Sequence, residues 1–251
     1  MQLDACVRSI ERCAPYAGAI VVIYKATNRD FGAAYDSLGV GSRVRLVPES
    51  DDFRRDVMHA LDAGDVHTVF HTDDDIVFRR PGIAPMPAPG FAAFSLRLGM
   101  NTTNCYPLDR PQRLPSFSAD GEVIAWDWTR ADADFAYPMS LNGHVFSTVL
   151  LRRMLARARF ANPNELEAQL HARRHLAPRW MLAFRESCLT SIPVNVVSST
   201  HENRAGGNAE LAPQALNARF LAGERIDIEA TDFSDVRGAH QEIPLVFERT
   251  A

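Results

Sequence analysis

The chain has 251 residues, of which 46% are hydrophobic and 23% are charged, and these globular values exclude a disordered chain or a fibre. Aspartate and glutamate outnumber lysine and arginine by 31 to 27, so the net charge of −4 disfavours a nucleic-acid-binding protein. The longest strongly apolar run, Ala19–Tyr24, is far too short to span a membrane, and the first residues lack the apolar core of a signal peptide. We therefore expect a cytoplasmic protein with no integral membrane segment.

The four cysteines show neither a CxxC pair nor the spacing of a zinc site. Cys6 and Cys13 are seven residues apart, two turns along one face of a predicted helix, and Cys105 and Cys188 stand alone. A chain of this length buries enough surface to fold without disulfides. Buried free thiols in a reducing compartment are the expected state.

Helical and strand-like patterns alternate in the first part of the chain. Apolar residues at helical spacing predict a helix that ends before Pro15, and the apolar segments Ala19–Tyr24 and Val44–Pro48 are typical of buried parallel strands. Ser50 is a suitable cap for the next helix, which Gly64 would end. This order predicts an α/β fold with a Rossmann-like, mixed but mostly parallel sheet flanked by helices.

The third predicted strand, Val66–His71, runs directly into three aspartates and a further apolar IVF segment. Beyond the proline-rich loop Pro81–Gly90, the pattern is more mixed. Strand-like pieces occur at GFAAFSLRLG, IAWDWT, IPVNVVSS and EIPLVFE, and a helix begins at Asn162-Pro163-Asn164-Glu165. We interpret the chain as one domain over residues 1–251, with a nucleotide-binding half (1–80) and an acceptor-binding half (81–251).

The segment His71-Thr72-Asp73-Asp74-Asp75 carries the clearest chemical signal. Three adjacent carboxylates repel one another, and a divalent cation bound by oxygen ligands removes that penalty. Ligands of open α/β sheets bind beyond the carboxyl ends of the strands, where these aspartates fall. A metal ion there could stabilise a diphosphate leaving group. The alternative is a solvated acidic turn, but a turn of this kind seldom lies between two apolar strands.

The acidic segment resembles the DxD motif of GT-A glycosyltransferases, and further blocks resemble bacterial family-2-like members. These blocks are VVIYKATN, FSLRLGMNTTNCYP, WDW, YPMSLNGHVF, NPNELE, VNVVSSTHENR and AHQEIP. The resemblance implies a GT-A-like fold and transfer of a sugar from a nucleotide-diphosphate donor to a glycan, lipid-linked or small hydroxyl acceptor. It also implies Mn²⁺ or Mg²⁺ as cofactor.

The resemblance also implies roles for the acidic residues. Asp73 and Asp74 would contact the donor nucleotide, and Asp73 and Asp75 would hold the metal ion with the diphosphate. A late histidine often completes the metal site in this family. His240 matches that position, and His201 is its rival.

Other residues would bind the donor and the acceptor. Lys25, Thr27 and Asn28 follow the strand Ala19–Tyr24, so they would contact the base or ribose, and Lys25 is the only lysine in the chain.

On the acceptor side, an inverting transfer requires a base for the acceptor hydroxyl. The YPMSLNGHVF block resembles the acceptor-binding segment of inverting GT-A enzymes, and this resemblance implies a carboxylate base before Gly143, at Asp132, with Asp134 and Asp127 as close rivals. His144 is a further candidate, since an unperturbed imidazole has a pKa near neutrality.

One departure from the family is clear, because the chain opens with the helix that normally follows a first strand. The resemblance therefore implies a GT-A-like sheet that lacks its usual first strand. Two alternative functions remain. One is a metal-dependent hydrolase that uses Asp73, Asp75, His144, His201 and His240. The other is a degenerate, non-catalytic domain that binds a nucleotide sugar.

Overall fold

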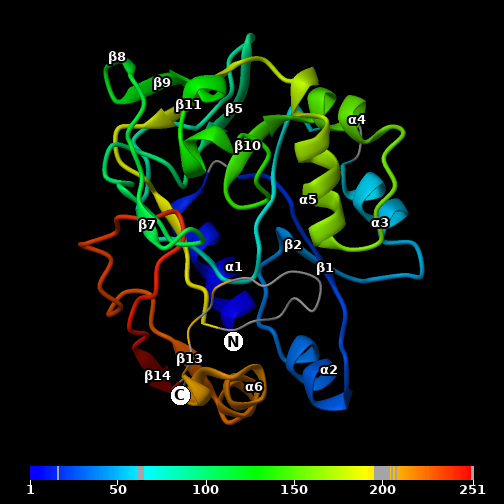
Figure 1. Ribbon diagram of the computed structural model, residues 1–251. Coiled ribbons are helices and arrows are strands. Elements are labelled where there is room, and N and C mark those ends of the chain that lie inside the picture. Colours follow the sequence, from blue (N-terminus) through cyan, green and yellow to red (C-terminus); the bar gives the residue numbers. More distant parts are fainter. Residues whose placement is uncertain (16, 62–64, 195–203, 205, 207, 250–251) are drawn as a thin grey trace.

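The computed structural model describes the chain except for residues 16, 62–64, 195–203, 205, 207 and 250–251 (Figure 1). The α-helices are α1 (Gln2–Cys13), α2 (Arg29–Asp36), α3 (Phe53–Ala60), α4 (Thr148–Leu155), α5 (Pro163–Ala172) and α6 (Pro213–Leu221). The short 3₁₀ helices are η1 (Trp128–Arg130), η2 (Ala133–Ala136), η3 (Arg174–Leu176) and η4 (Ala209–Leu211). The strands are β1 (Ile20–Tyr24), β2 (Val44–Pro48), β3 (His67–Val69), β4 (Asp75–Val77), β5 (Phe91–Ser95), β6 (Asn104–Cys105), β7 (Arg110–Pro111), β8 (Ser118–Asp120), β9 (Val123–Asp127), β10 (His144–Ser147), β11 (Trp180–Phe184), β12 (Leu189–Ser191), β13 (Glu224–Ile226) and β14 (Phe247–Arg249).

The predicted α/β class is confirmed, but the prediction of a mostly parallel, Rossmann-like sheet is wrong. The main sheet has the order β3-β10-β5-β11-β9-β8, and only its β5–β11 pair is parallel. The parallel pair β1–β2 and the antiparallel pair β4–β12 form separate two-stranded sheets. The expected parallel pairing of Ala19–Tyr24 with Val44–Pro48 is observed, although these strands are only half-buried. The error lies in the strands of the second half, because an apolar pattern does not reveal the direction of a strand.

Two local features of the chain produce the antiparallel pairs. β8 and β9 form a hairpin whose two-residue turn begins with Gly121 at a φ of 55°, a conformation that suits the twist of the strands. β10 enters between β3 and β5 after Gly143, which has a φ of 64°. A Cβ at Gly143 would lie 2.8 Å from the side chain of Leu189, so only glycine fits there.

Several predicted helices are confirmed, although their caps differ in detail. α1 ends before Pro15 as expected. α3 is capped by Asp52, whose side chain accepts from Arg55 N, whereas the predicted cap Ser50 bonds to Asp56. α5 begins at its predicted cap, Asn162. The strand predicted over IPVNVVSS lies mostly outside the described residues, and the observed strand β12 ends before it.

Buried clusters cover both faces of the main sheet. The larger cluster joins the sheet to α3, α4 and α5, and Figure 1 shows these helices on one side of it. The second joins it to α1, β4 and β12. All four cysteines are free and buried, as the sequence predicts. Among the described residues, no helix is long and apolar enough to cross a membrane.

The larger core makes a direct stability prediction. Phe146 lies in the middle of β10, is fully buried, and its ring centroid is 6.5 Å from that of Phe70. Phe146→Ala is expected to lower the free energy of unfolding by about 3–5 kcal/mol, because it leaves a cavity in a packed layer. Denaturant unfolding measures this loss, and Leu221→Ala, at a side chain that is 44% exposed, is the control. Equal stability of the two variants would contradict the assigned core.

Candidate functional site

The acidic segment forms a tight turn between β3 and β4, closed by a hydrogen bond from Asp75 N to Thr72 O (3.1 Å). α1 contacts this turn and the strand β4 that follows it. The Cys6 thiol lies 3.5 Å from Thr72 O, and Ser9 Oγ accepts from Val77 N at 3.0 Å. The side chain of Asp73 is exposed, that of Asp74 is half-buried and that of Asp75 is fully buried.

Asp75 is the centre of a hydrogen-bond network. Its Oδ1 accepts from Asn142 Nδ2 (3.0 Å) and Ser191 Oγ (2.5 Å), and its Oδ2 lies 3.1 Å from His71 Nδ1 and 3.2 Å from Thr72 N. Burial would raise the pKa of Asp75, but the hydrogen bond and charge of His71, with Ser191 and Asn142, hold it below its ordinary value. Asp75 is therefore an ionised, saturated carboxylate.

The pKa values of the other two carboxylates are shifted in the opposite direction. Burial, followed by repulsion from Asp75 and Asp73, raises the pKa of Asp74 to about 7, although Thr72 Oγ1 donates to it at 2.5 Å. Partial loss of water, and then repulsion from Asp75, also raise the pKa of Asp73, although the N-terminal ammonium group lowers it. The turn thus carries negative charge that its neighbours compensate only in part, and a cation would relieve it.

A second cluster surrounds the buried Arg97, which follows β5. Its guanidinium lies 2.5 Å from Ser140 Oγ, 3.2 Å from Asp134 Oδ1 and 3.3 Å from His240 Nδ1. Asp134 Oδ2, Arg97 Nε and both ring nitrogens of His144 are buried without a hydrogen-bond partner among the described residues. Such unsatisfied groups are uncommon in native cores and concentrate at functional sites.

Ser191 connects the two clusters. Its hydroxyl binds Asp75, and its backbone forms a parallel bridge with His240, through Ser191 N to Ala239 O and Gln241 N to Ser191 O, both at 3.0 Å. The predicted late histidine therefore lies beside the acidic segment. Burial, and then the charge of Arg97, lower the pKa of His240 to about 3, so its imidazole is neutral.

The predicted donor-binding residues lie on the loop between β1 and α2. Lys25 Nζ pairs with Glu49 at 3.0 Å, Asn28 caps α2 by accepting from Phe31 N, and Thr27 is exposed. α2 also approaches the acidic turn: the pKa of Tyr35 is raised first by burial and then by the charge of Asp73. Among the described residues, Lys25 and Asn28 bond to Glu49 and Phe31 and not to the acidic turn.

The four candidate bases lie in different surroundings. Asp132 lies on the surface, where Arg110 binds it at 2.9 and 3.0 Å and, with Arg113 N, lowers its pKa to about 2. Asp127 bonds to Thr129 and Arg179. Only Asp134 joins the Arg97 cluster. His144 is 1% exposed, and burial, followed by the charge of Arg97, lowers its pKa to about 3.

The residues best placed to hold a metal ion differ from the expected ligands Asp73, Asp75 and His240. Within the described residues, no group of three or more His, Cys, Asp or Glu side chains is placed to hold a metal ion. The oxygens of Asp75 already accept several donors, and His240 Nδ1 faces a guanidinium. Asp73 and Asp74 fit better, since Mg²⁺ is often held by one or two carboxylates with substrate phosphates and water. The rival ligand His201 lies outside the described residues.

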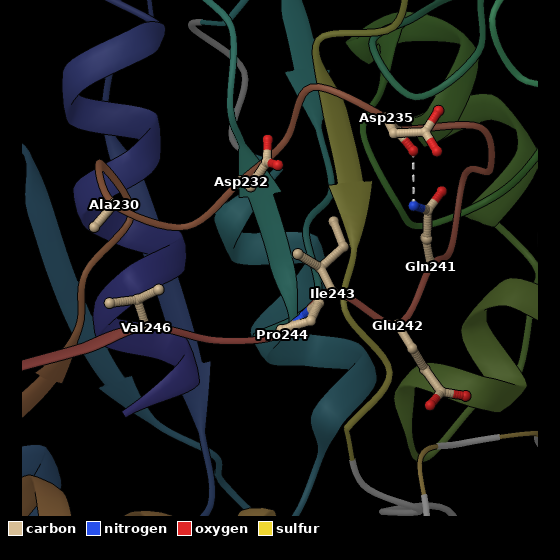
Figure 2. Close-up of a pocket in the computed structure, with 8 residues that line it drawn as sticks. All are labelled: Ala230, Asp232, Asp235, Gln241, Glu242, Ile243, Pro244 and Val246. Atoms are coloured by element: carbon tan, nitrogen blue, oxygen red, sulfur yellow. Dashed lines mark hydrogen bonds between the residues drawn. The ribbon is translucent and has the colours of Figure 1, made fainter.

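A pocket of about 350 Å³ lies on the C-terminal segment, just beyond His240 (Figure 2). Figure 2 shows its lining, in which Gln241 Nε2 donates to the backbone oxygen of Asp235 at 2.9 Å. The lining residues are Ala230, Asp232, Asp235, Gln241, Glu242, Ile243, Pro244 and Val246. None of the predicted site residues lines this pocket, so it is separate from the acidic turn.

Sequence reasoning missed Arg97, Ser140 and Ser191 as members of the site. Arg97 and Ser140 lie within quoted family-like blocks, FSLRLG and YPMSLNGH, but no spacing rule places them beside Asp134 or His240. Ser191 lies beside an apolar segment and gives no signal of its own. Comparison of the chain with protein-family models and with curated proteins finds no match.

Proposed function

We propose that this protein is a glycosyltransferase that moves a sugar from a nucleotide-diphosphate donor to a hydroxyl acceptor, with Mn²⁺ or Mg²⁺ at the acidic turn. The observation that carries the proposal is the incompletely compensated charge of Asp73 and Asp74, where burial and neighbouring carboxylates raise the pKa of Asp74 to about 7. A cation and a diphosphate supply complementary charges for this turn.

The convergence of distant segments supports the same function. Five blocks of sequence meet around Asp75 and Arg97, through Asn142, Ser191 and His240. Four of them, which carry Asp75, Arg97, Asn142 and His240, are blocks that resemble GT-A glycosyltransferases. A hydrolase with several histidines on one metal is less well supported, because His240 contacts Arg97 and His144 is buried.

Each residue then has a specific task. Asp73 and Asp74 would hold the cation, which when bound neutralises the diphosphate and makes it a better leaving group. Asp75 holds Asn142, Ser191 and the turn in one geometry and does not itself need a free oxygen. The β1–α2 loop, with Lys25, would contact the donor nucleotide.

For the acceptor, Asp134 is a better base than Asp132. Asp134 keeps one oxygen without a donor, whereas both oxygens of Asp132 are held by Arg110. In an inverting transfer this oxygen would take the proton of the attacking hydroxyl.

The two carboxylates can be separated by kinetics. Asp134→Asn is expected to lower kcat by about 100-fold or more, because the variant has no base, while Asp132→Asn keeps kcat near that of the wild type. Release of the nucleoside diphosphate measures the rate. If Asp132→Asn lowered kcat and Asp134→Asn did not, Asp132 would be the base.

Calorimetric titration tests the donor site. UDP, GDP and their sugars are titrated with Mn²⁺ and with EDTA, and one nucleotide is expected to bind only with the metal. Asp74→Asn should abolish that binding, and Asp120→Asn, in the exposed β8–β9 hairpin, should preserve it. Binding that is equally strong in EDTA, or absent for every nucleotide, would contradict the proposal.

A further inference from the structure

Positive charge is concentrated in one segment of a chain that is acidic as a whole. Residues 149–180 contain seven arginines and two glutamates, an excess of five positive charges, whereas the net charge of the chain is −4. This segment comprises α4, α5 and η3 with their connections. Figure 1 shows α4 beside α5, at the opposite end of the molecule from β13, β14 and α6. Such a local excess attracts anionic partners.

The exposed face of α4 carries much of this charge. Val149, Arg152 and Arg153 are exposed and share one helical face, and the exposed Arg157 follows directly after the helix. Arg159 is also exposed. We call these five residues, together with Val66, the arginine surface.

Two bare valines lie at one end of the arginine surface. Val149 is 75% exposed and Val66 is 73% exposed. They are neighbours, because Thr148 N donates to Val66 O at 3.1 Å. Because these two side chains remain mostly in water, folding buries little of their apolar surface. Their transfer into an apolar environment outside the protein would be favourable.

Most arginines of this surface have no carboxylate partner. Arg152 donates to the backbone oxygen of Leu61 at 2.8 Å. Within the described part of the chain, Arg153, Arg157 and Arg159 form no ion pair, as is also true of Arg45 and Arg80 on other parts of the surface. Their charge is therefore available to a partner.

From this arrangement we infer that the arginine surface docks the protein on an anionic lipid bilayer. The guanidinium groups lie against the lipid phosphates, and Val66 and Val149 enter the boundary between headgroups and acyl chains. A bilayer matches both features, since it offers negative charge and an apolar layer beneath it. A nucleic acid would use the arginines but would leave the two valines in water. The inference does not depend on the proposed sugar transfer.

Co-sedimentation with vesicles tests this surface. The protein is expected to sediment with vesicles of phosphatidylcholine and phosphatidylglycerol, to remain free with phosphatidylcholine alone, and to be released by high salt. Arginine near an anionic membrane contributes a roughly fivefold gain in binding per residue, so Arg153→Gln/Arg157→Gln/Arg159→Gln should weaken binding by about 100-fold. Arg152 is left in place because it holds Leu61.

Two further variants separate this surface from general charge. Arg45→Gln/Arg80→Gln/Arg249→Gln removes the same charge from other exposed sites and should bind vesicles nearly as well as the wild type. Val66→Ser/Val149→Ser should weaken binding without changing its salt dependence. Absence of wild-type binding to anionic vesicles, or equal losses in the two arginine triples, would overturn the inference. Binding to single-stranded RNA in place of anionic vesicles would overturn it as well.

Discussion

Asp75→Ala is expected to lower the free energy of unfolding by about 3–5 kcal/mol, although it removes an acidic residue from a crowded acidic turn. Asp75 is fully buried and accepts from Asn142, Ser191 and Thr72 N. Without the carboxylate, Ser191 Oγ and Thr72 N lose this acceptor, and Asn142 keeps only its bonds to the hydroxyls of Thr72 and Ser191. Each buried hydrogen bond left unmade costs about 1–3 kcal/mol. Urea unfolding followed by circular dichroism measures the loss.

Asp73→Ala is the matched control for this change. Asp73 is two residues away and exposed, so its removal should change the free energy of unfolding by no more than about 0.5 kcal/mol. Both variants are expected to lose metal-dependent nucleotide binding. If Asp75→Ala were as stable as Asp73→Ala, Asp75 would not be the centre of a buried network.

Asp74→Asn is expected to stabilise the protein at neutral and alkaline pH while it removes metal binding. The pKa of Asp74 is raised to about 7 by burial and by Asp75 and Asp73, and its ordinary value is 3.8. Between these two values the unfolded chain has released the proton and the folded chain still holds it. The contribution of Asp74 to stability therefore falls as the pH rises from about 4 to about 7 and stays low above that.

Asparagine cannot ionise, so the stability gained by Asp74→Asn should grow over the same pH range and reach about 2 kcal/mol or more near pH 8. Urea unfolding of both proteins at about pH 5 and about pH 8 gives the two differences. Mn²⁺ should then raise the Tm of the wild type and leave that of the variant unchanged. A variant that is equally or less stable than the wild type at pH 8 would show that the folded protein does not disfavour the ionised form of Asp74.

Much of the first half could be predicted because its signals are local. The apolar stripe of α1, the strands β1 and β2, and the three aspartates that lead into β4 are all visible in the local pattern of the chain. The cap of α3 was misplaced by two residues, from Asp52 to Ser50, because both side chains can accept a backbone hydrogen bond. Boundaries of this kind depend on small energy differences.

The direction of the strands and the position of α4 depend on contacts between residues that are distant in the sequence. α4 follows β10 without a loop, and its first residues, Thr148 and Val149, are β-branched and continue the pattern of a strand. β10 runs antiparallel to β3 and β5, and Gly143, which precedes it with a positive φ, lies against Leu189, a residue far away in the sequence.

The candidate site shows the same division. The acidic turn and His240 were expected near each other, and Ser191 brings them together. The ionised Asp75 was expected to face a metal ion, but tertiary contacts with Asn142 and Ser191 fill its oxygens. The burial of Asp134 beside Arg97 depends on the packing of η2 against the strands, which the spacing of aspartates does not reveal.

Electron–nuclear double resonance of Mn²⁺ tests most directly whether the acidic turn holds a metal ion against a diphosphate. The protein is mixed with Mn²⁺ and with the nucleoside diphosphate that calorimetry identifies. Phosphorus-31 couplings from a protein-bound Mn²⁺ are expected in the wild type and in Asp120→Asn, and both the bound signal and the couplings should vanish in Asp74→Asn. A spectrum of free hydrated Mn²⁺ in the wild type, or couplings that survive in Asp74→Asn, would contradict a metal-dependent glycosyl transfer at this turn.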